Sequence, residues 1–305
     1  MTYEKGQTIT AQDFNNFRQD VVEIYGVGTG DKGYGQTTPV IPIINPGDVI
    51  SNEWKILRDV IDIIADHQGV SVDLLPLTSD FDTGEQIIAF DTNSPSKSFV
   101  EMINLIRDNK FETDNNASIT LIPEVNTITQ TSSWGNGGND SITKNANISF
   151  SNEDNIRFFF NSGGEIKINF EHPNGSSPQD SDWRNIFNNI GDISLKAHST
   201  TNSGSVGSPA TTTGYYELTS NFQTIYNGIN IGNGAYSSND VIVEARTTNI
   251  SRVNNGNGST IEVKMTLRDQ HSNSFSDNVS SGTEFKFDIL IADVVLSGIE
   301  QPTIN

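Results

Sequence analysis

From residue 155 to residue 170 the sequence reads NIRFFFNSGGEIKINF, and this stretch decides the expected fold. Its three consecutive phenylalanines, Phe158 to Phe160, carry too much apolar area to be left in solvent. The pair Gly163-Gly164 supplies residues that tolerate a positive φ, as tight turns require. After the turn, Ile166, Ile168 and Phe170 alternate with polar residues, which is typical of a half-buried strand. The stretch therefore predicts a strand, a turn and a second strand, a hairpin in the core of an antiparallel domain.

The composition favours short strands joined by many turns. Hydrophobic residues make up 34% of the 305 residues, below the roughly 45% of ordinary globular chains. Asn, Ser, Thr and Gly fill the difference, and these residues favour turns and strand edges. The length is sufficient for two domains.

The excess of acidic residues bears on which kinds of partner the chain could bind. The formal net charge is −20, from 38 acidic and 18 basic residues. Nucleic-acid binding depends on Lys and Arg that neutralise phosphates, so the sequence predicts no nucleic-acid partner. Basic partners and bound cations both remain compatible with this charge, and composition does not separate them.

Cysteine and long apolar runs are both missing from the sequence. Without cysteine there is no disulfide, no thiolate metal site and no thiol catalysis. No run approaches about 18 apolar residues, so no membrane insertion is expected. The first residues lack an apolar signal core, which predicts no Sec-type export.

Two similar helical segments occupy the first 70 residues. Each begins at a capping residue, Thr10 or Ser51, and each is followed by a glycine, Gly26 or Gly69. Each presents an apolar stripe at helical spacing, formed by Phe14, Phe17, Val21 and Ile24 in the first and by Trp54, Leu57, Ile61 and Ile64 in the second. Arg18 and Arg58 occupy matching positions and are candidates for ion pairs or oligomer contacts, with a solvated helix face as the alternative.

The segment between these helices, residues 26–36, is rich in glycine. Residues 28–33 match Gly-x-Gly-x-x-Gly, but no strand is predicted before them, and Pro39 and Pro42 follow where a dinucleotide fold needs a helix. We therefore expect a permissive loop that wraps a neighbouring subunit, and no bound cofactor.

The chain as a whole is predicted to be mainly β with short helices (α+β). Residues 1–75 form a helical repeat and glycine-loop region for oligomerisation or attachment. Residues 76–126 form a small connecting α/β module, with a strand at 87–90, a helix at 98–110 and a strand at 119–122 that Pro123 ends. Residues 127–305 form a Greek-key-like antiparallel β-sandwich domain.

Within the β domain, alternation predicts strands at 142–150, 193–197, 215–218, 240–247, 260–267 and 283–290. Ser181 is expected to cap a short helix that packs on the sheet through Trp183, Ile186, Phe187 and Ile190. Residues 199–213 suggest a mobile loop, 220–226 a helical turn and 254–258 a hairpin turn. The tail, residues 291–305, is expected to end as an edge strand or a linker.

The residue types that carry chemistry form no recognisable constellation. His67, His172, His198 and His271 lie in four different segments, and no pair has the spacing of a zinc helix. Pairs of carboxylates, Asp180 with Asp182 and Glu153 with Asp154, suit glycoside hydrolysis only if they face a cleft. The segment Asn152–Asn155 offers oxygens to calcium without a dedicated loop pattern. Trp134, Tyr215, Tyr216 and Tyr236 are candidates for sugar stacking, with core packing as the favoured alternative.

Two features together resemble virion structural proteins of tailed bacteriophages, especially myophages of marine bacteria. One is the helix and glycine-loop pattern from Ile9-Thr10 through residues 30–36 to Ile50-Ser51-Asn52-Glu53-Trp54. The other is residues 157–166 with Trp183 and Gly214-Tyr215-Tyr216-Glu217-Leu218 downstream. The resemblance covers residues 5–295 and its motifs include no catalytic residue. It implies a tail, neck or baseplate component, in the virion and assembled in the host cytoplasm, that contacts other virion proteins.

The expected function is therefore a structural, non-enzymatic one, with no catalytic residue, cofactor or metal. The second helix is apolar over more than one face, through Ile56, Val60 and Ile63, so residues 1–75 are expected to pack against other copies of the chain. A trimer follows from analogy with fibres alone. Two alternatives stay open: a glycan-binding adhesin of a tail fibre that recognises the host surface, and a glycosidase or depolymerase.

Overall fold

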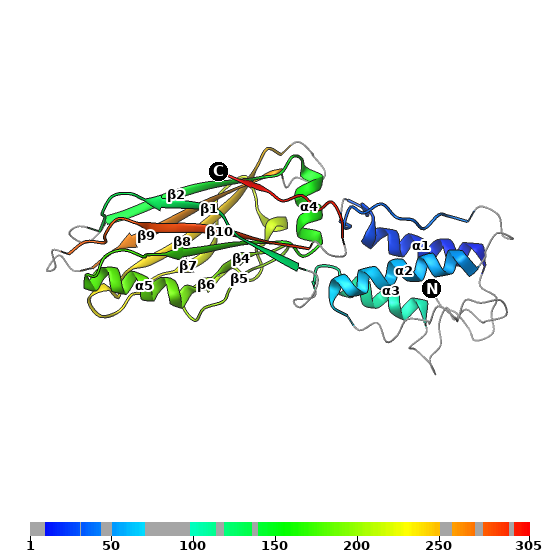
Figure 1. Ribbon diagram of the computed structural model, residues 1–305, viewed down its shortest axis with the longest axis horizontal. Helices are drawn as coiled ribbons and strands as arrows, with labels where there is room; N and C mark the ends of the chain where they lie inside the picture. Colours follow the sequence, from blue (N-terminus) through cyan, green and yellow to red (C-terminus); the bar gives the residue numbers. More distant parts are fainter. Residues whose placement is uncertain are drawn as a thin grey trace. The chain divides into compact units, whose positions relative to one another are not determined.

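The computed structural model describes residues 10–30, 32–43, 51–70, 98–113, 119–135, 140–250, 258–271, 277–292 and 296–305. The chain divides into two compact units, each discontinuous in sequence. The helical unit comprises residues 1–120, 157–163 and 292–299, and the β unit comprises residues 121–156, 164–291 and 300–305. Helices and an antiparallel β-sandwich together make a mainly-β α+β fold, as predicted (Figure 1).

The helical unit is built from α1 (Ala11–Tyr25), α2 (Ser51–Gln68) and α3 (Phe99–Asp108). Thr10 starts α1 with a capping box, in which its hydroxyl accepts from the Asp13 N–H at 3.2 Å and the Asp13 carboxylate accepts from the Thr10 N–H at 2.8 Å. Ser98 caps α3 with a single hydrogen bond, in which its hydroxyl accepts from the N–H of Glu101. All three helices lie where the apolar spacing predicted them.

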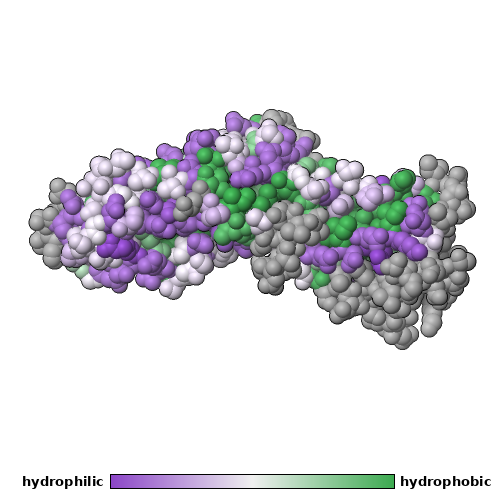
Figure 2. Space-filling model, in the orientation of Figure 1, coloured by the Kyte–Doolittle hydropathy of each residue, from purple (hydrophilic) through white to green (hydrophobic). Residues whose placement is uncertain are grey.

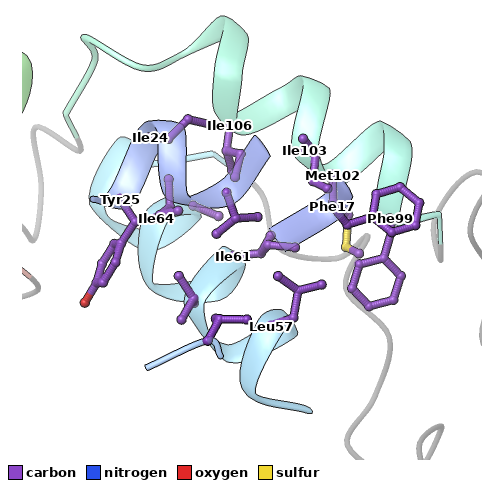
Figure 3. Close-up of a cluster of buried hydrophobic side chains, with 14 of the residues drawn as sticks. Phe17, Ile24, Tyr25, Leu57, Ile61, Ile64, Phe99, Met102, Ile103 and Ile106 are labelled. Atoms are coloured by element: carbon purple, nitrogen blue, oxygen red, sulfur yellow. The ribbon is translucent and has the colours of Figure 1, made fainter. Parts of the chain in front are cut away.

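Aromatic contacts join the three helices into one core. The ring of Trp54 lies 5.0 Å from that of Phe14 and 5.0 Å from that of Phe99, in edge-to-face arrangements. Figure 3 shows the side chains of all three helices converging, with α3 contributing Phe99, Met102, Ile103 and Ile106. Val60 is 1% exposed, while Ile56 and Ile63 pack at the rim of this core. The additional apolar face of α2 therefore finds cover inside the chain, from the helix that the sequence assigned to a connecting module.

The glycine-rich segment after α1 folds back on the end of that helix. Gly33 donates to the carbonyl of Val27 at 2.8 Å, and Tyr34 donates to the carbonyl of Ile24 at 2.8 Å. A Cβ on Gly33 would lie 1.9 Å from the carbonyl oxygen of Gly26, so no other residue fits there. The described part of the loop is thus a compact turn within the helical unit.

The first half of the central stretch is helical, so the predicted hairpin is wrong there. Helix α4 spans Glu153–Asn161, and Asn152 caps it by accepting from the Asn155 N–H at 2.9 Å. The cap and the acidic first turn, Glu153 and Asp154, favour a helix, and they outweigh the β-propensity of the phenylalanines. The segment offered as a calcium site is therefore a helix start.

Helical spacing also changes which phenylalanines are buried. Phe159 and Phe160 are fully buried with Ile156, whereas Phe158 is only partly buried. Gly163 has a φ of +77° and turns the chain into β3 (Glu165–Glu171), whose buried and half-buried residues alternate as predicted.

The β unit is an antiparallel sandwich of two sheets. One sheet has the order β1-β10-β3-β4-β5 and the other the order β11-β2-β9-β8-β7-β6. The remaining strands are β1 (Ile119–Gln130), β2 (Asp140–Ser149), β4 (Ile193–Leu195), β5 (Thr200–Asn202), β6 (Ser208–Pro209), β7 (Gln223–Gly228), β8 (Asp240–Thr248), β9 (Thr260–Asp269), β10 (Thr283–Ala292) and β11 (Thr303–Ile304). β9 and β10 pair with β2 and β3, which come much earlier in the chain, in a Greek-key-like manner.

Strands β8 and β9 bury one face and leave the other half-buried. From their second residue on they alternate, with Val241, Val243, Val263 and Met265 fully buried. On the side shown in Figure 2 the surface of the β unit is mostly hydrophilic or neutral. The core therefore lies between the sheets.

Helix α5 (Pro178–Ile190) packs on the five-stranded sheet, as expected. Its Phe187 stacks on Phe170 of β3, with ring centroids 5.5 Å apart. Its cap is Ser177 and not Ser181, because Ser177 and Asp180 form a capping box and a proline follows the cap.

Several local predictions need correction. Residues 199–213 contain β5 and β6, residues 215–217 form a 3-10 helix (η3, Tyr215–Glu217) in place of a strand, and residues 223–228 form β7 in place of a helical turn. β1 continues through Pro123, which is compatible with its position at a sheet edge. The strand predicted at 87–90 and most of the turn at 254–258 lie outside the described residues, and the tail ends in the edge strand β11.

Candidate functional site

Acidic and polar side chains gather in the β unit where β9 ends. This end cluster consists of Asp182, Tyr236, Asp269, His271 and Asp277. His271 Nδ1 lies 2.8 Å from Asp269 Oδ2, and its Nε2 lies 3.8 Å from Asp277 Oδ1. The hydroxyl of Tyr236 donates to the other oxygen of Asp277. The side chains of Asp269 and His271 are fully buried and in hydrogen-bond contact, whereas His271 Nε2 and Asp277 Oδ1 are too far apart for a direct hydrogen bond.

Local structure brings the distant members of the cluster together. Asp182 lies in the first half of α5, and its carboxylate accepts from the backbone N–H of Asn233 at 2.9 Å. Gly232 precedes that residue, and a Cβ there would meet the carbonyl of Tyr236 at 2.0 Å and the carboxylate of Asp182 at 2.9 Å. The short 3-10 helix η4 (Gly234–Tyr236) then places the Tyr236 ring 5.5 Å from that of His271.

In the end cluster, burial favours carboxyl groups that are protonated or that accept hydrogen bonds. Burial raises the pKa of Asp182, and the nearby charge of Asp269 adds to the rise. Burial likewise raises the pKa of Asp269, although hydrogen bonds from Gln179 and His271 oppose the effect. The pKa of Tyr236 is raised by burial and by its bond to Asp277, so its phenol stays protonated.

The cluster offers acceptors more than donors. Asp269 Oδ1 and Gln179 Oε1 are buried and make no hydrogen bond within the part of the chain that the structure describes. Among the described residues, no group of three or more His, Asp or Glu side chains has the arrangement of a metal site. A fully buried Asp269–His271 pair is also out of reach of a substrate, so its geometry serves the fold by tying the end of β9 to Asp277.

A second buried network surrounds His172 and Asp180. Trp134 Nε1 donates to the hydroxyl of Thr283 at 3.2 Å, and that hydroxyl lies 3.1 Å from His172 Nδ1. His172 Nε2 lies 2.8 Å from Asp180 Oδ1. An indole can only donate, so the Thr283 hydroxyl accepts from Trp134 and links it to His172.

Asp180 accepts hydrogen bonds on both oxygens. Burial would raise its pKa, but the Ser280 and Ser177 N–H groups, at 2.7 and 3.0 Å, and His172 lower it to about 2. The carboxylate is thus committed to the start of α5 and to residue 280. It is not paired with Asp182 across a cleft, as glycoside hydrolysis would require.

The other two histidines have separate environments. The side chain of His198 is 46% exposed, lies 2.8 Å from Glu217 and stacks on Tyr216. His67 is buried in the helical unit beside Tyr34, and burial lowers its pKa to about 4. The four histidines therefore do not converge, in agreement with their sequence spacing.

Most aromatic candidates for sugar stacking are used within the fold. Trp134 is buried 4.9 Å from Trp183, and Tyr215 is buried with its hydroxyl donating to the Gly258 carbonyl at 3.2 Å. Tyr236 belongs to the end cluster. Tyr216 is partly exposed, but one neighbour of its ring is already His198. These contacts match the core-packing alternative.

The two repeat arginines differ in their partners. Arg18 Nε donates to the carbonyl of Val40 at 2.9 Å and so fixes the segment after the glycine loop. Arg58 pairs with the adjacent Asp59. Arg18 thus contributes to the fold of its own unit.

A hollow of about 300 Å³ lies between α1 and α3. Phe17, Val100 and Ile103 line its apolar part. Its polar groups bond one another, since Arg107 lies 3.1 Å from Asp20 and donates to Asn104 at 3.1 Å. The volume is at the lower limit for small-molecule sites.

Sequence reasoning missed the end cluster, because its members are distant in sequence and no spacing rule links them. The one local signal was Asp182, two residues after the capping Asp180. Comparison of the chain with protein-family models, curated proteins and solved structures finds no match. None of the helices in the described ranges combines the length and apolar character needed to cross a membrane.

Proposed function

We propose that the chain is a structural component of a tailed-phage virion, in the tail, neck or baseplate, that assembles as a homo-oligomer and contacts other virion proteins. The observation that carries the proposal is that residues with side chains suited to catalysis are used to hold the fold together. Asp180 caps a helix and holds Ser280, His172 links Asp180 to Thr283, and Asp269 anchors His271. Groups that could serve catalysis are engaged in building the fold.

The motifs that carry the phage resemblance have architectural roles as well. Asn161, at the end of the phenylalanine motif, donates to the Gly33 carbonyl of the glycine loop at 2.8 Å. Tyr34 of that loop donates to the Lys110 carbonyl at 2.7 Å and accepts from Gln68 at 2.7 Å. Residues of both motifs thus hold the helical unit together, which suits a particle building block.

Purified particles of the phage that encodes the chain provide the direct test. Antibodies raised against the recombinant protein should label one fixed location on the particle in immuno-electron microscopy. Quantitative mass spectrometry should find a constant copy number per particle relative to the major capsid protein. A protein that is abundant in infected cells but missing from purified particles would refute the proposal.

Activity assays separate the structural role from the enzymatic alternative. Incubation with host surface polysaccharide should release no product. Release that is abolished by Asp182→Asn, while the unfolding transition is retained, would assign a depolymerase instead. Because the variant would still be folded, its loss of product release could not be attributed to unfolding.

A further inference from the structure

Strand β1 is a long strand at an open sheet edge. It spans Ile119–Gln130 and lies at the end of the five-stranded sheet, where β10 is its one strand partner among the described residues. The other three terminal strands in the described sheets, β5, β6 and β11, have only three, two and two residues. Short terminal strands limit edge-to-edge pairing, whereas a long open edge is a template for another strand.

Backbone geometry identifies the groups on the open side. The carbonyl of Gln130 faces β10, because it accepts from the Gly282 N–H at 2.7 Å. In a strand, the N–H and C=O groups of alternate residues point to opposite edges. Those of residues 129, 127 and 125 therefore point away from β10. Pro123 has the same parity, so its missing N–H leaves the pairing with β10 intact and removes one donor from the open side.

The side chains of residues 121–130 suit a strand-to-strand contact. Leu121 is 50% exposed, and Ile122, Val125 and Ile128 are only partly buried. Glu124 is the single charged residue of this stretch, in a chain with a net charge of −20. Most proteins protect such an edge with charges, which is the opposite of what β1 does.

We propose that β1 pairs antiparallel with β1 of a second copy of this chain, about a two-fold axis at Val125. In this register Ile122 lies opposite Ile128 of the second copy, and Glu124 lies opposite Asn126. The apolar residues then pair across the interface. The inference rests on the proposed homo-oligomer and names its contact.

A second copy fits this edge because it brings an equal, open and extended strand. Among the described strands, β2 also leaves residues 140–146 without a partner on the side away from β9. That part of β2 carries the charged residues Asp140 and Lys144, which protect an edge, whereas residues 121–130 of β1 carry one charge. An isologous contact through a single edge closes at two copies. The pairing therefore gives two copies per contact, whereas the fibre analogy gives three, and a mass measurement distinguishes them.

Cross-linking tests the register directly, because the natural chain contains no cysteine. At the two-fold axis, Val125→Cys places two thiols on strands whose Cα atoms are about 5.5 Å apart, within disulfide range. Mild oxidation should convert this variant to a covalent dimer. Thr143→Cys, on the exposed outer face of β2, is the matched control and should stay monomeric on denaturing gels.

A proline scan of the open edge tests the pairing without a cross-link. Thr127→Pro removes an N–H from the open side and should shift the light-scattering mass from 66.6 kDa, twice the 33.3 kDa chain, to 33.3 kDa. Thr127→Val keeps the N–H and the β-branched shape and should remain dimeric. Circular dichroism confirms that each variant is folded, and Val125→Cys supplies the answer if Thr127→Pro does not fold.

The outcomes separate this inference from the proposed function. A wild-type oligomer that neither cross-links through Val125→Cys nor dissociates in Thr127→Pro refutes the β1 contact and leaves the homo-oligomer intact. A chain that stays monomeric at high concentration and pairs only with another virion protein refutes self-pairing. Particle labelling is unaffected by either result and tests the virion role by itself.

Discussion

Replacement of Asp180 by asparagine is expected to destabilise the β unit by about 2–3 kcal/mol at neutral pH. The Asp180 pKa is lowered from 3.8 to about 2 in the folded chain, and each pKa unit corresponds to about 1.4 kcal/mol of differential stability. Both carboxylate oxygens accept two hydrogen bonds, from Ser280 and His172 on one side and from Ser177 and Ser280 on the other. An asparagine supplies only one such oxygen, and its NH2 group faces the remaining donors.

The sign of the pH dependence follows from the lowered pKa. The stabilisation by the charged carboxylate is fully present above the unfolded pKa of about 3.9, and it is lost as pH falls through the folded pKa of about 2. Urea unfolding monitored by tryptophan fluorescence should therefore show the largest difference between wild type and Asp180→Asn at pH 7. The difference should shrink steadily below pH 4.

Asp192→Asn is the matched control for this experiment. Asp192 follows the C-terminus of the same helix, its side chain is 42% exposed, and it lies 3.8 Å from Lys167. Exposed pairs of this kind contribute at most about 1 kcal/mol. Equal unfolding midpoints for Asp180→Asn and wild type at pH 7, or a difference that is the same at pH 7 and pH 3, would refute the assigned network.

Three further predictions concern the helical unit. Phe159→Ala should cost about 3–5 kcal/mol, as measured by thermal or urea unfolding, and Phe158→Ala clearly less, since only Phe159 is fully buried; equal costs would contradict the helical assignment of α4. Gly163→Ala should destabilise by more than about 1 kcal/mol, because its φ is +77° and a Cβ would lie 2.1 Å from Thr113, and a wild-type melting temperature would show that this turn differs. Burial lowers the His67 pKa to about 4, so the stability that the neutral ring provides is complete above about pH 6.5 and is lost as pH falls toward 4. His67→Met should remove this part of the pH dependence of the free energy of unfolding. An unchanged pH profile in that variant would contradict the lowered pKa.

The predictions from sequence succeeded where one face of an element is buried by a regular pattern. Phe14, Phe17, Val21 and Ile24 mark α1 because a helix on a core needs that spacing. Alternation marks β8, β9 and β10 for the equivalent reason in sheets. These elements follow from local spacing alone.

The predictions failed where a competing signal for a different secondary structure was overlooked. Phe158 to Phe160 favour a strand by propensity, but the Asn152 cap and the acids after it begin a helix. Residues 223–228 pair with β8 across a bulge, and a long-range pairing of this kind cannot be read from local spacing.

The arrangement of α3 and the end cluster lay beyond sequence reasoning for a different reason. The stripe of α3 was predicted, but its partner was not, because a stripe does not specify what covers it. Asp182 and Asp269 likewise meet only through tertiary packing. The cover that α3 provides removes the apolar-excess argument for packing residues 1–75 against other chains. Deletion of residues 1–75 is then expected to expose Phe99 and Met102 as well.

The discontinuity of the helical unit has a consequence for synthesis on the ribosome. Leu296 is 1% exposed in the same core as Phe14 and Trp54, and Gln36 exchanges hydrogen bonds with the backbone of Ser297. The core around α1 and α2 is therefore complete only after residues 296 and 297 have been translated. Until then the apolar stripes of α1 and α2 are accessible to chaperones. A nascent chain that is cut short before Leu296 should therefore be recognised by chaperones through its incomplete helical unit.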